Sequence, residues 1–201
     1  MQPRKQHLIE TALTLFNQYG YHATGIDLIL AESGVSKATL YKHFRSKEAL
    51  ILAALQLRHE QVITRLQATI DNNTKTQLKH DLTDQKTMNN ASTNAATNKA
   101  DSEKLLAIFD DLNDWFNSET FFGCNFINVS AEYADPNHPI NLFAAKHKQA
   151  IVDVIGAQLA EQESHKADQI GLLIEGAIVM AHTRGIKQSA LLAKEMARQL
   201  I

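Results

Sequence analysis

Apolar residues recur every three or four positions along most of this 201-residue chain, and this spacing places them on one face of an α-helix. In the first stripe, Leu8, Ala12 and Phe16 are followed by Gly20, a residue type that commonly ends a helix. The same period predicts helices at about 8–19, 26–32, 37–44, 47–70, 105–116, 143–155, 166–184 and 189–200, with a short segment at 124–133. The sequence has no convincing run of alternating strand residues, so it predicts an all-α fold.

The periodic pattern stops between residues 71 and 104, where Asn, Thr, Lys and Asp dominate and large apolar residues are few. Such a segment buries too little apolar surface to offset the entropy of ordering it. We therefore predict a disordered loop at about 75–100, although Leu78 and Leu82, four residues apart, leave open that part of it extends a neighbouring helix. The predicted domains are 1–50 and 51–201.

Composition excludes several classes of protein. Cys124 is the only cysteine, which excludes a disulfide scaffold and any zinc site that needs two cysteines, and is typical of a reducing compartment. The longest apolar stretch, 170–181, is shorter than the roughly 20 residues of a membrane helix, and the N-terminus lacks the apolar core of a signal peptide. We expect a cytoplasmic protein with no membrane partner. We predict no metal site, because the nine histidines show no metal-binding spacing. We also predict no cofactor and no catalytic site, because no acid or oxyanion site is evident beside a Cys124–His147 pair.

Charge is distributed unevenly along the chain. The net charge is −2, but residues 1–59 carry +3 and the remaining residues carry −5. This asymmetry favours a small anion-binding head on an acidic body, with chance scatter of charge as the alternative.

Two short predicted helices, 26–32 and 37–44, are joined by a tight turn that contains Gly34. Ser36 is a favourable N-cap for the second helix, and Leu40 and Phe44 face inward. The pair is a candidate helix-turn-helix, whose second helix would enter the major groove of DNA, and an ordinary helical hairpin is the alternative. The side chains suited to phosphates or base edges are Ser36, Lys37, Thr39, Tyr41 and Lys42.

Two stretches carry a resemblance to a known family: GYHATGID at 20–27 and GVSKATLYKHFRSKEAL at 34–50. Over about residues 4–55 the chain closely resembles the DNA-binding domain of the TetR (tetracycline-repressor) family of bacterial transcriptional regulators. One departure is Gly25, where many relatives carry Ser or Thr. The resemblance implies an N-terminal three-helix helix-turn-helix domain followed by a helical ligand-binding and dimerisation domain.

Transferred residue by residue, the resemblance implies phosphate contacts at Thr24, Tyr41 and Lys47. The groove-facing residues that it implies are Ser36, Lys37, Ala38, Thr39, Lys42 and His43. Because Ala38 is small and Thr39 is short, we expect few bidentate base contacts and a contribution from DNA shape.

The remaining apolar residues suggest a ligand pocket and a dimer interface, with plain core as the alternative for the aromatic residues. The predicted pocket residues are Phe109, Leu112, Trp115, Phe116, Cys124, Phe126, Phe143 and His147. The predicted dimer residues are Ile170, Ile174, Ala177, Ile178, Ala181, Leu192 and Met196. The hypothesis is a homodimeric, sequence-specific repressor, released from a pseudo-palindromic double-stranded DNA operator by a small hydrophobic or aromatic ligand. The alternatives are a repressor that senses oxidants or electrophiles through Cys124, and a helical adaptor that binds protein.

Overall fold

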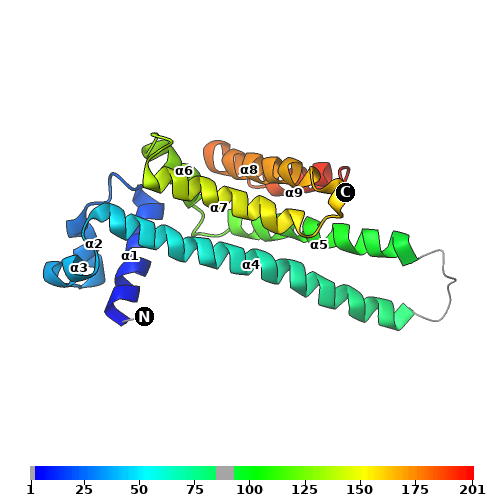
Figure 1. Cartoon of the computed structure of the whole chain (residues 1–201), viewed down its shortest axis with the longest axis horizontal. Coiled ribbons are helices and arrows are strands. Elements are labelled where there is room, and N and C mark those ends of the chain that lie inside the picture. Colours follow the sequence, from blue (N-terminus) through cyan, green and yellow to red (C-terminus); the bar gives the residue numbers. More distant parts are fainter. Residues whose placement is uncertain (1–2, 85–92) are drawn as a thin grey trace. The chain divides into compact units, whose positions relative to one another are not determined.

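The computed structural model describes the backbone of residues 3–84 and 93–201, and the side chains of these residues except 72–102 and Gln162. Within those ranges every regular element is helical, which confirms the predicted all-α fold (Figure 1). The elements are α1 (Pro3–Tyr19), α2 (Ile26–Ser33), α3 (Lys37–His43), α4 (Lys47–Asp84), α5 (Thr93–Phe116), α6 (Asn125–Glu132), α7 (Pro139–Gly156), a 3₁₀ turn (Glu161–Glu163), α8 (Lys166–Arg184) and α9 (Ser189–Ala197).

The chain forms two compact units. The first contains Met1–Val62 and Phe122–Gln149, and the second contains Ile63–Phe121 and Ala150–Ile201. These units are defined by which residues pack together. The predicted domains 1–50 and 51–201 are defined by their expected roles in binding DNA and in binding ligand, and they stay a prediction. In the described part of the chain, no helix is long and apolar enough to span a membrane.

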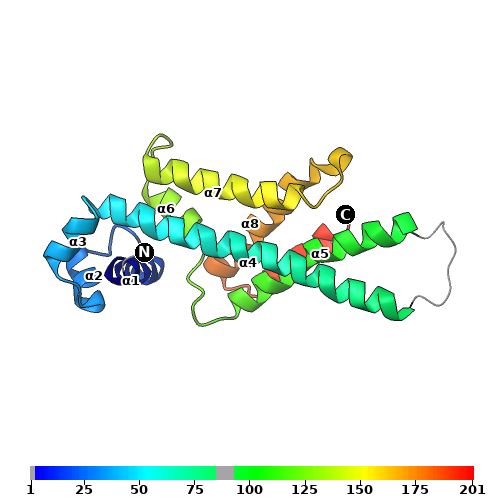
Figure 2. The ribbon, with the colours of Figure 1, turned by 60° about the horizontal axis from the view of Figure 1, so that its bottom comes forward.

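In the first unit, α1, α2 and α3 gather around the start of α4 (Figure 2). The apolar stripe of α1, including Leu8, Ala12 and Phe16, is almost completely buried. It shares this core with Ile29 of α2 and Leu40 of α3, both of which have no exposed surface. The spacing of apolar residues therefore predicted most of the inner face of α1 correctly, but Tyr19, at the end of the stripe, is 54% exposed.

The predicted loop at 75–100 is wrong at both of its ends, because α4 continues to Asp84 and α5 begins at Thr93. The intervening residues 85–92 lie outside the described residues. The segment 71–104 contains neither Gly nor Pro, the two residue types that interrupt helices most strongly, so polar helices can extend to Asp84 from one side and begin at Thr93 on the other. Low hydrophobicity was thus a poor guide to where the helices end.

In the second unit, α8 packs against α9 and α5. Five of the predicted dimer residues face this internal core with at most 5% of their surface exposed: Ile170, Ile174, Ala177, Ile178 and Ala181. The dimer prediction is therefore wrong for these five, because they already pack within the chain. Leu192 and Met196 of α9 are more than half exposed, and α8 exposes Leu172 and Val179 in place of its predicted face.

Candidate nucleic-acid interface

A left-handed turn and a side-chain cap set the start of α3. Gly34 ends α2 with φ +63°, a backbone conformation that residues with a Cβ rarely adopt. Two residues later Ser36 caps α3, and its hydroxyl accepts the Thr39 N–H at 3.2 Å. Both features confirm the predicted turn, and together they fix α3 as a separate short helix after α2.

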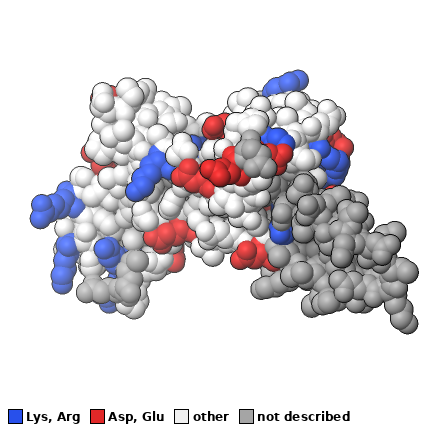
Figure 3. Space-filling model, turned by 45° about the vertical axis from the view of Figure 1, so that its right-hand side comes forward, with Lys and Arg blue, Asp and Glu red and all other residues white. Residues whose placement is uncertain are grey.

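The two sides of α3 differ sharply in burial and chemistry. Leu40 and the following Phe44 are at most 4% exposed. The outer side is polar, and Lys and Arg side chains gather over the N-terminal helices at the left of Figure 3. The predicted residues that are exposed are Ser36, Lys37, Ala38, Tyr41 and Lys42, and those that are half-buried are Thr39 and His43.

Three polar side chains at the start of α3, those of Ser36, Lys37 and Thr39, have partners within the chain. The Lys37 ammonium lies 3.9 Å from a carboxylate oxygen of Asp27, and both side chains are largely exposed, so water screens this pair. The Ser36 and Thr39 hydroxyl oxygens are 2.9 Å apart. An anion or a base edge would therefore compete with a weak ion pair and with one hydroxyl–hydroxyl bond.

Thr24 does not lie on this outer side. Its side chain is fully buried, and its hydroxyl lies 2.7 Å from the Gly20 carbonyl oxygen and 3.2 Å from that of Leu15. The predicted phosphate contact of the Thr24 hydroxyl is therefore not available in this structure. The hydroxyl instead closes the turn after α1, because a buried hydroxyl must find an acceptor within the protein.

Lys47 is the first residue of α4, and its ammonium donates to the carbonyl of His22 at 3.1 Å. Partial burial lowers the pKa of Lys47 below its ordinary value, and the nearby Glu132 carboxylate acts in the opposite direction. This lysine is thus held in place at the helix start. Sequence reasoning missed the contact of Lys47 with His22, and it missed Glu132, whose carboxylate accepts the His22 N–H from 110 residues away along the chain.

Four of the eight predicted pocket residues lie in the first unit, where Phe143 and His147 contact His59 of α4, and Phe126 contacts Phe143 and His147. The His147 ring stacks on Phe126 with their centroids 3.5 Å apart, and its Nδ1 atom lies 2.9 Å from Nδ1 of His59. Burial, and then the charges of Lys148, His59 and Arg58, lower the pKa of His147 to about 3. The fourth residue is Cys124, whose sulfur accepts a hydrogen bond from the Lys148 ammonium at 3.2 Å.

The other four predicted pocket residues lie in the second unit. Phe109 and Phe116 are at most 1% exposed and belong to its core. Trp115 is half-buried and meets Phe121 edge-on at 4.9 Å, and Leu112 is also half-buried. The predicted residues thus divide equally between two units, and a common ligand pocket stays a prediction.

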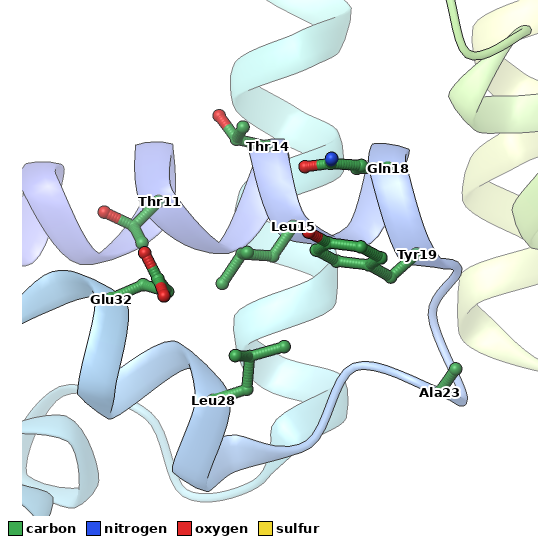
Figure 4. A pocket seen from close by; sticks show the side chains of 8 residues that line it. All are labelled: Thr11, Thr14, Leu15, Gln18, Tyr19, Ala23, Leu28 and Glu32. Atoms are coloured by element: carbon green, nitrogen blue, oxygen red, sulfur yellow. The ribbon is translucent and has the colours of Figure 1, made fainter.

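A hollow of about 670 Å³, which the sequence did not predict, opens between α1 and α2 in the first unit (Figure 4). Leu15 and Leu28 point toward each other across it, and the Thr11 and Glu32 side chains approach at one end. Its lining residues are Thr11, Thr14, Leu15, Gln18, Tyr19, Ala23, Leu28 and Glu32. Among the side chains that the structure describes, no group of three His, Cys, Asp or Glu residues is placed to hold a metal ion.

The segment that contains α2 and α3 is similar in sequence to known proteins. The family model for bacterial regulatory proteins of the tetR family matches residues 8–54. YerO of Bacillus subtilis, an uncharacterized HTH-type transcriptional regulator, is 45% identical over 56 residues, which are 28% of this chain and 19% of YerO. FasR of Mycolicibacterium smegmatis, an HTH-type transcriptional activator, is 41% identical over 73 residues, which are 34% of this chain and 33% of FasR. The chain thus matches between a fifth and a third of the length of these relatives.

Solved structures resemble the chain over nearly its whole length. A TetR-family transcriptional regulator from Streptomyces coelicolor is similar with a TM-score of 0.73 and 25% identity, covering 99% of this chain and 90% of that one. The reduced form of Escherichia coli NemR has a TM-score of 0.76 and 19% identity, covering 98% and 95%, a likeness of fold alone. The family match over the helix-turn-helix and the likeness to the Streptomyces regulator agree, and residues 8–54 of this chain form a DNA-binding domain of the tetR family of bacterial regulatory proteins.

Proposed function

We propose that this protein is a homodimeric, sequence-specific DNA-binding transcriptional regulator, and that it represses transcription until a small hydrophobic or aromatic ligand releases it from a pseudo-palindromic operator. The observation that carries the proposal is the outer side of α3, where exposed Lys37, Tyr41 and Lys42 stand opposite the buried Leu40. A helix with an anchored apolar side and a cationic outer side is suited to the major groove. The proposed role is regulatory rather than catalytic.

Specific and non-specific contacts come from different side chains in this proposal. Lys47, at the start of α4, contacts a phosphate, and such a contact positions the protein on any sequence. Thr39, on α3, contacts a base edge through its hydroxyl or methyl group. Since Ala38 and Thr39 reach only a short distance, part of the sequence preference comes from the shape of the DNA.

Two substitutions test this division of roles. We expect Lys47→Ala to weaken binding to all sequences alike and to reduce the slope of log affinity against log salt by about one unit for each bound protomer, because each protomer loses one phosphate contact. We expect Thr39→Ala to change the ranking of DNA sequences. Both are measured by selecting sequences from a random DNA pool with each variant, followed by titration of labelled duplexes at several salt concentrations.

Lys146→Ala is the control for charge, because Lys146 is an exposed lysine of α7 outside the proposed interface. It removes the same charge as Lys47→Ala and should leave the slope nearly unchanged. If Lys47→Ala altered sequence preference while total affinity stayed intact, the assignment of the two roles would be wrong. The relative FasR is described as an activator. A promoter reporter therefore tests separately whether this protein represses or activates transcription.

Release by a ligand is a two-state mechanism in this proposal. A ligand shifts the equilibrium between DNA-binding and non-binding arrangements only by its difference in affinity for the two. The Phe126, Phe143 and His147 cluster in the first unit and the Trp115 and Phe121 pair in the second unit support an apolar, aromatic ligand. Both clusters also fit plain core, so ligand identity stays a matter for screening.

A second candidate function rests on the contact between Cys124 and Lys148. An ammonium 3.2 Å from a sulfur is the kind of setting in which thiols react with oxidants and electrophiles. If the regulator senses oxidants, hydrogen peroxide should weaken operator binding by wild type at least tenfold, and Cys124→Ser should retain binding in its presence. An equal response of both proteins would exclude this thiol as the sensor. The experiment is an electrophoretic mobility shift with and without subsequent dithiothreitol.

A further inference from the structure

The loop between α1 and α2, residues 20–24, is held by a carboxylate from a distant helix. Glu132, the last residue of α6, accepts the Tyr21 N–H at 2.8 Å through Oε1 and the His22 N–H at 2.5 Å through Oε2. The loop and α6 both belong to the first unit. Two backbone N–H groups on one ionised carboxylate form charge-assisted hydrogen bonds, which are stronger than those between neutral groups.

The loop is shaped to let this carboxylate approach. Gly20 has φ +90°, and a Cβ atom built there would lie 3.1 Å from Oε1 of Glu132. A larger residue at this position would be strained by the backbone conformation and would also crowd the carboxylate. Gly20 therefore does more than end α1, because it makes room for Glu132.

The first residue of α6 anchors the same loop. The Tyr21 side chain is fully buried and stacks on Phe16 with ring centroids 5.1 Å apart, and its hydroxyl accepts from the Asn125 amide at 3.2 Å. The burial raises the pKa of Tyr21. Residues at both ends of α6 thus hold the loop, Asn125 through the Tyr21 hydroxyl and Glu132 through the backbone N–H groups of Tyr21 and His22, so α6 and the loop are joined at two points.

His22 connects this attachment to the proposed phosphate contact. Its N–H is held by Glu132, and its carbonyl oxygen accepts from the Lys47 ammonium at 3.1 Å. Its ring adds two contacts, because Nδ1 lies 3.2 Å from Oε2 of Glu132 and the ring stacks on Tyr133 at 4.7 Å. One residue therefore joins the carboxylate of α6 to the ammonium at the start of α4.

We propose that Glu132 is a positioning residue for DNA binding, which acts from α6 through the His22 backbone to hold the Lys47 ammonium where it meets a phosphate. This inference rests on the proposed function. A displacement of α6 would then change DNA affinity by moving Lys47, without any change in α3.

The sign of the effect separates positioning from simple electrostatics. Glu132 is an anion close to a DNA-binding lysine, so its charge alone repels DNA, and its removal would tighten binding. Positioning predicts the opposite, because a released Lys47 must be ordered again when DNA binds. We expect Glu132→Ala to weaken binding about tenfold. We expect Glu132→Gln, which keeps one acceptor oxygen for the loop, to weaken it less.

The experiment is a double-mutant cycle on the full-length chain, with a fluorescein-labelled duplex selected from a random pool by the wild-type protein. Anisotropy titrations compare wild type, Glu132→Ala, Lys47→Ala and the double variant. If Glu132 acts through Lys47, its substitution has little further effect once Lys47 is alanine. Circular dichroism melting sets a temperature at which all four proteins are folded, and Glu132→Gln replaces Glu132→Ala in the cycle if the alanine variant does not fold.

Glu119→Ala is the matched control, because Glu119 is an exposed carboxylate of the second unit and its removal changes the net charge equally. It should leave affinity unchanged or slightly raised. The inference is overturned if Glu132→Ala leaves DNA affinity unchanged or raises it, as expected for Glu119→Ala. It is also overturned if the double variant loses as much binding free energy as the two single variants together. A wild-type protein that selects no duplex overturns the proposed function first, and this inference with it.

Discussion

Acidification from pH 7 to pH 5 should lower the free energy of unfolding by about 2 kcal/mol through His147 alone. The His147 side chain is almost completely buried, stacked on Phe126 and bonded to His59. Burial, with the charges of Lys148, His59 and Arg58, lowers its pKa to about 3. The unfolded chain takes up a proton near pH 6.5 and the folded protein does so only near pH 3, so stability present above pH 6.5 is lost as the pH falls between these values.

Urea denaturation at half-unit intervals between pH 7.5 and pH 5 measures this loss. Because other groups also take up protons in this pH range, the informative quantity is the difference in pH dependence between a variant and the wild-type protein. His147→Gln should flatten the pH dependence by the stated amount, whatever it does to stability at pH 7. His165→Gln, at an exposed histidine, should leave the dependence as in wild type. An unchanged slope in His147→Gln would show that His147 does not couple folding to protons.

Leu192→Asp should convert the protein from dimer to monomer and weaken operator binding at least a hundredfold. We propose that α8 and α9 pair with their symmetry mates through the apolar residues they leave exposed. Leu172 is 74% exposed on α8, and Leu192 and Met196 are 56% and 51% exposed on α9. An aspartate buried in this interface without a partner would have to be desolvated, and two-fold symmetry would impose that cost twice.

The effect on DNA follows from the loss of the second half-site. A dimer on a pseudo-palindromic site binds both half-sites at once, and this avidity commonly contributes a factor of 10² to 10⁴ in affinity. Leu142→Asp is the matched control, because Leu142 is a leucine of α7 that is 54% exposed outside the proposed interface. Light scattering gives the oligomeric state of each variant. A dimeric Leu192→Asp would place the interface elsewhere.

The sequence predicted features whose residues lie close together along the chain, and it did not predict contacts between residues that are far apart in sequence. The turn at Gly34 and the Ser36 cap follow from residues within one helical turn, and both are confirmed. The attachment of Glu132 to the loop at residues 20–24 joins positions more than 100 residues apart, and no local pattern encodes such a contact. The phosphate contact at Thr24 is implied by the resemblance alone, and the burial of its hydroxyl depends on the packing of neighbouring helices, which no local pattern encodes.

The orientation of α8 was unpredictable for a different reason. Its apolar residues occupy nearly the whole circumference, so periodicity gives no single inner face. Ile174 and Ala177 face the core while Leu172 and Val179 face outward, although all four are apolar. A helix that is apolar on two sides predicts two packing partners, but periodicity does not say which side would pack against which partner.

The bond between His59 and His147 constrains the tautomers of both rings. The two Nδ1 atoms, 2.9 Å apart, share one proton when both rings are neutral, so one ring donates and the other accepts. The donor ring then has a lone pair on its Nε2, and the acceptor ring has its proton on Nε2. The pair therefore presents one acceptor and one donor at its outer nitrogens, and exchange of tautomers reverses this polarity without any change in net charge.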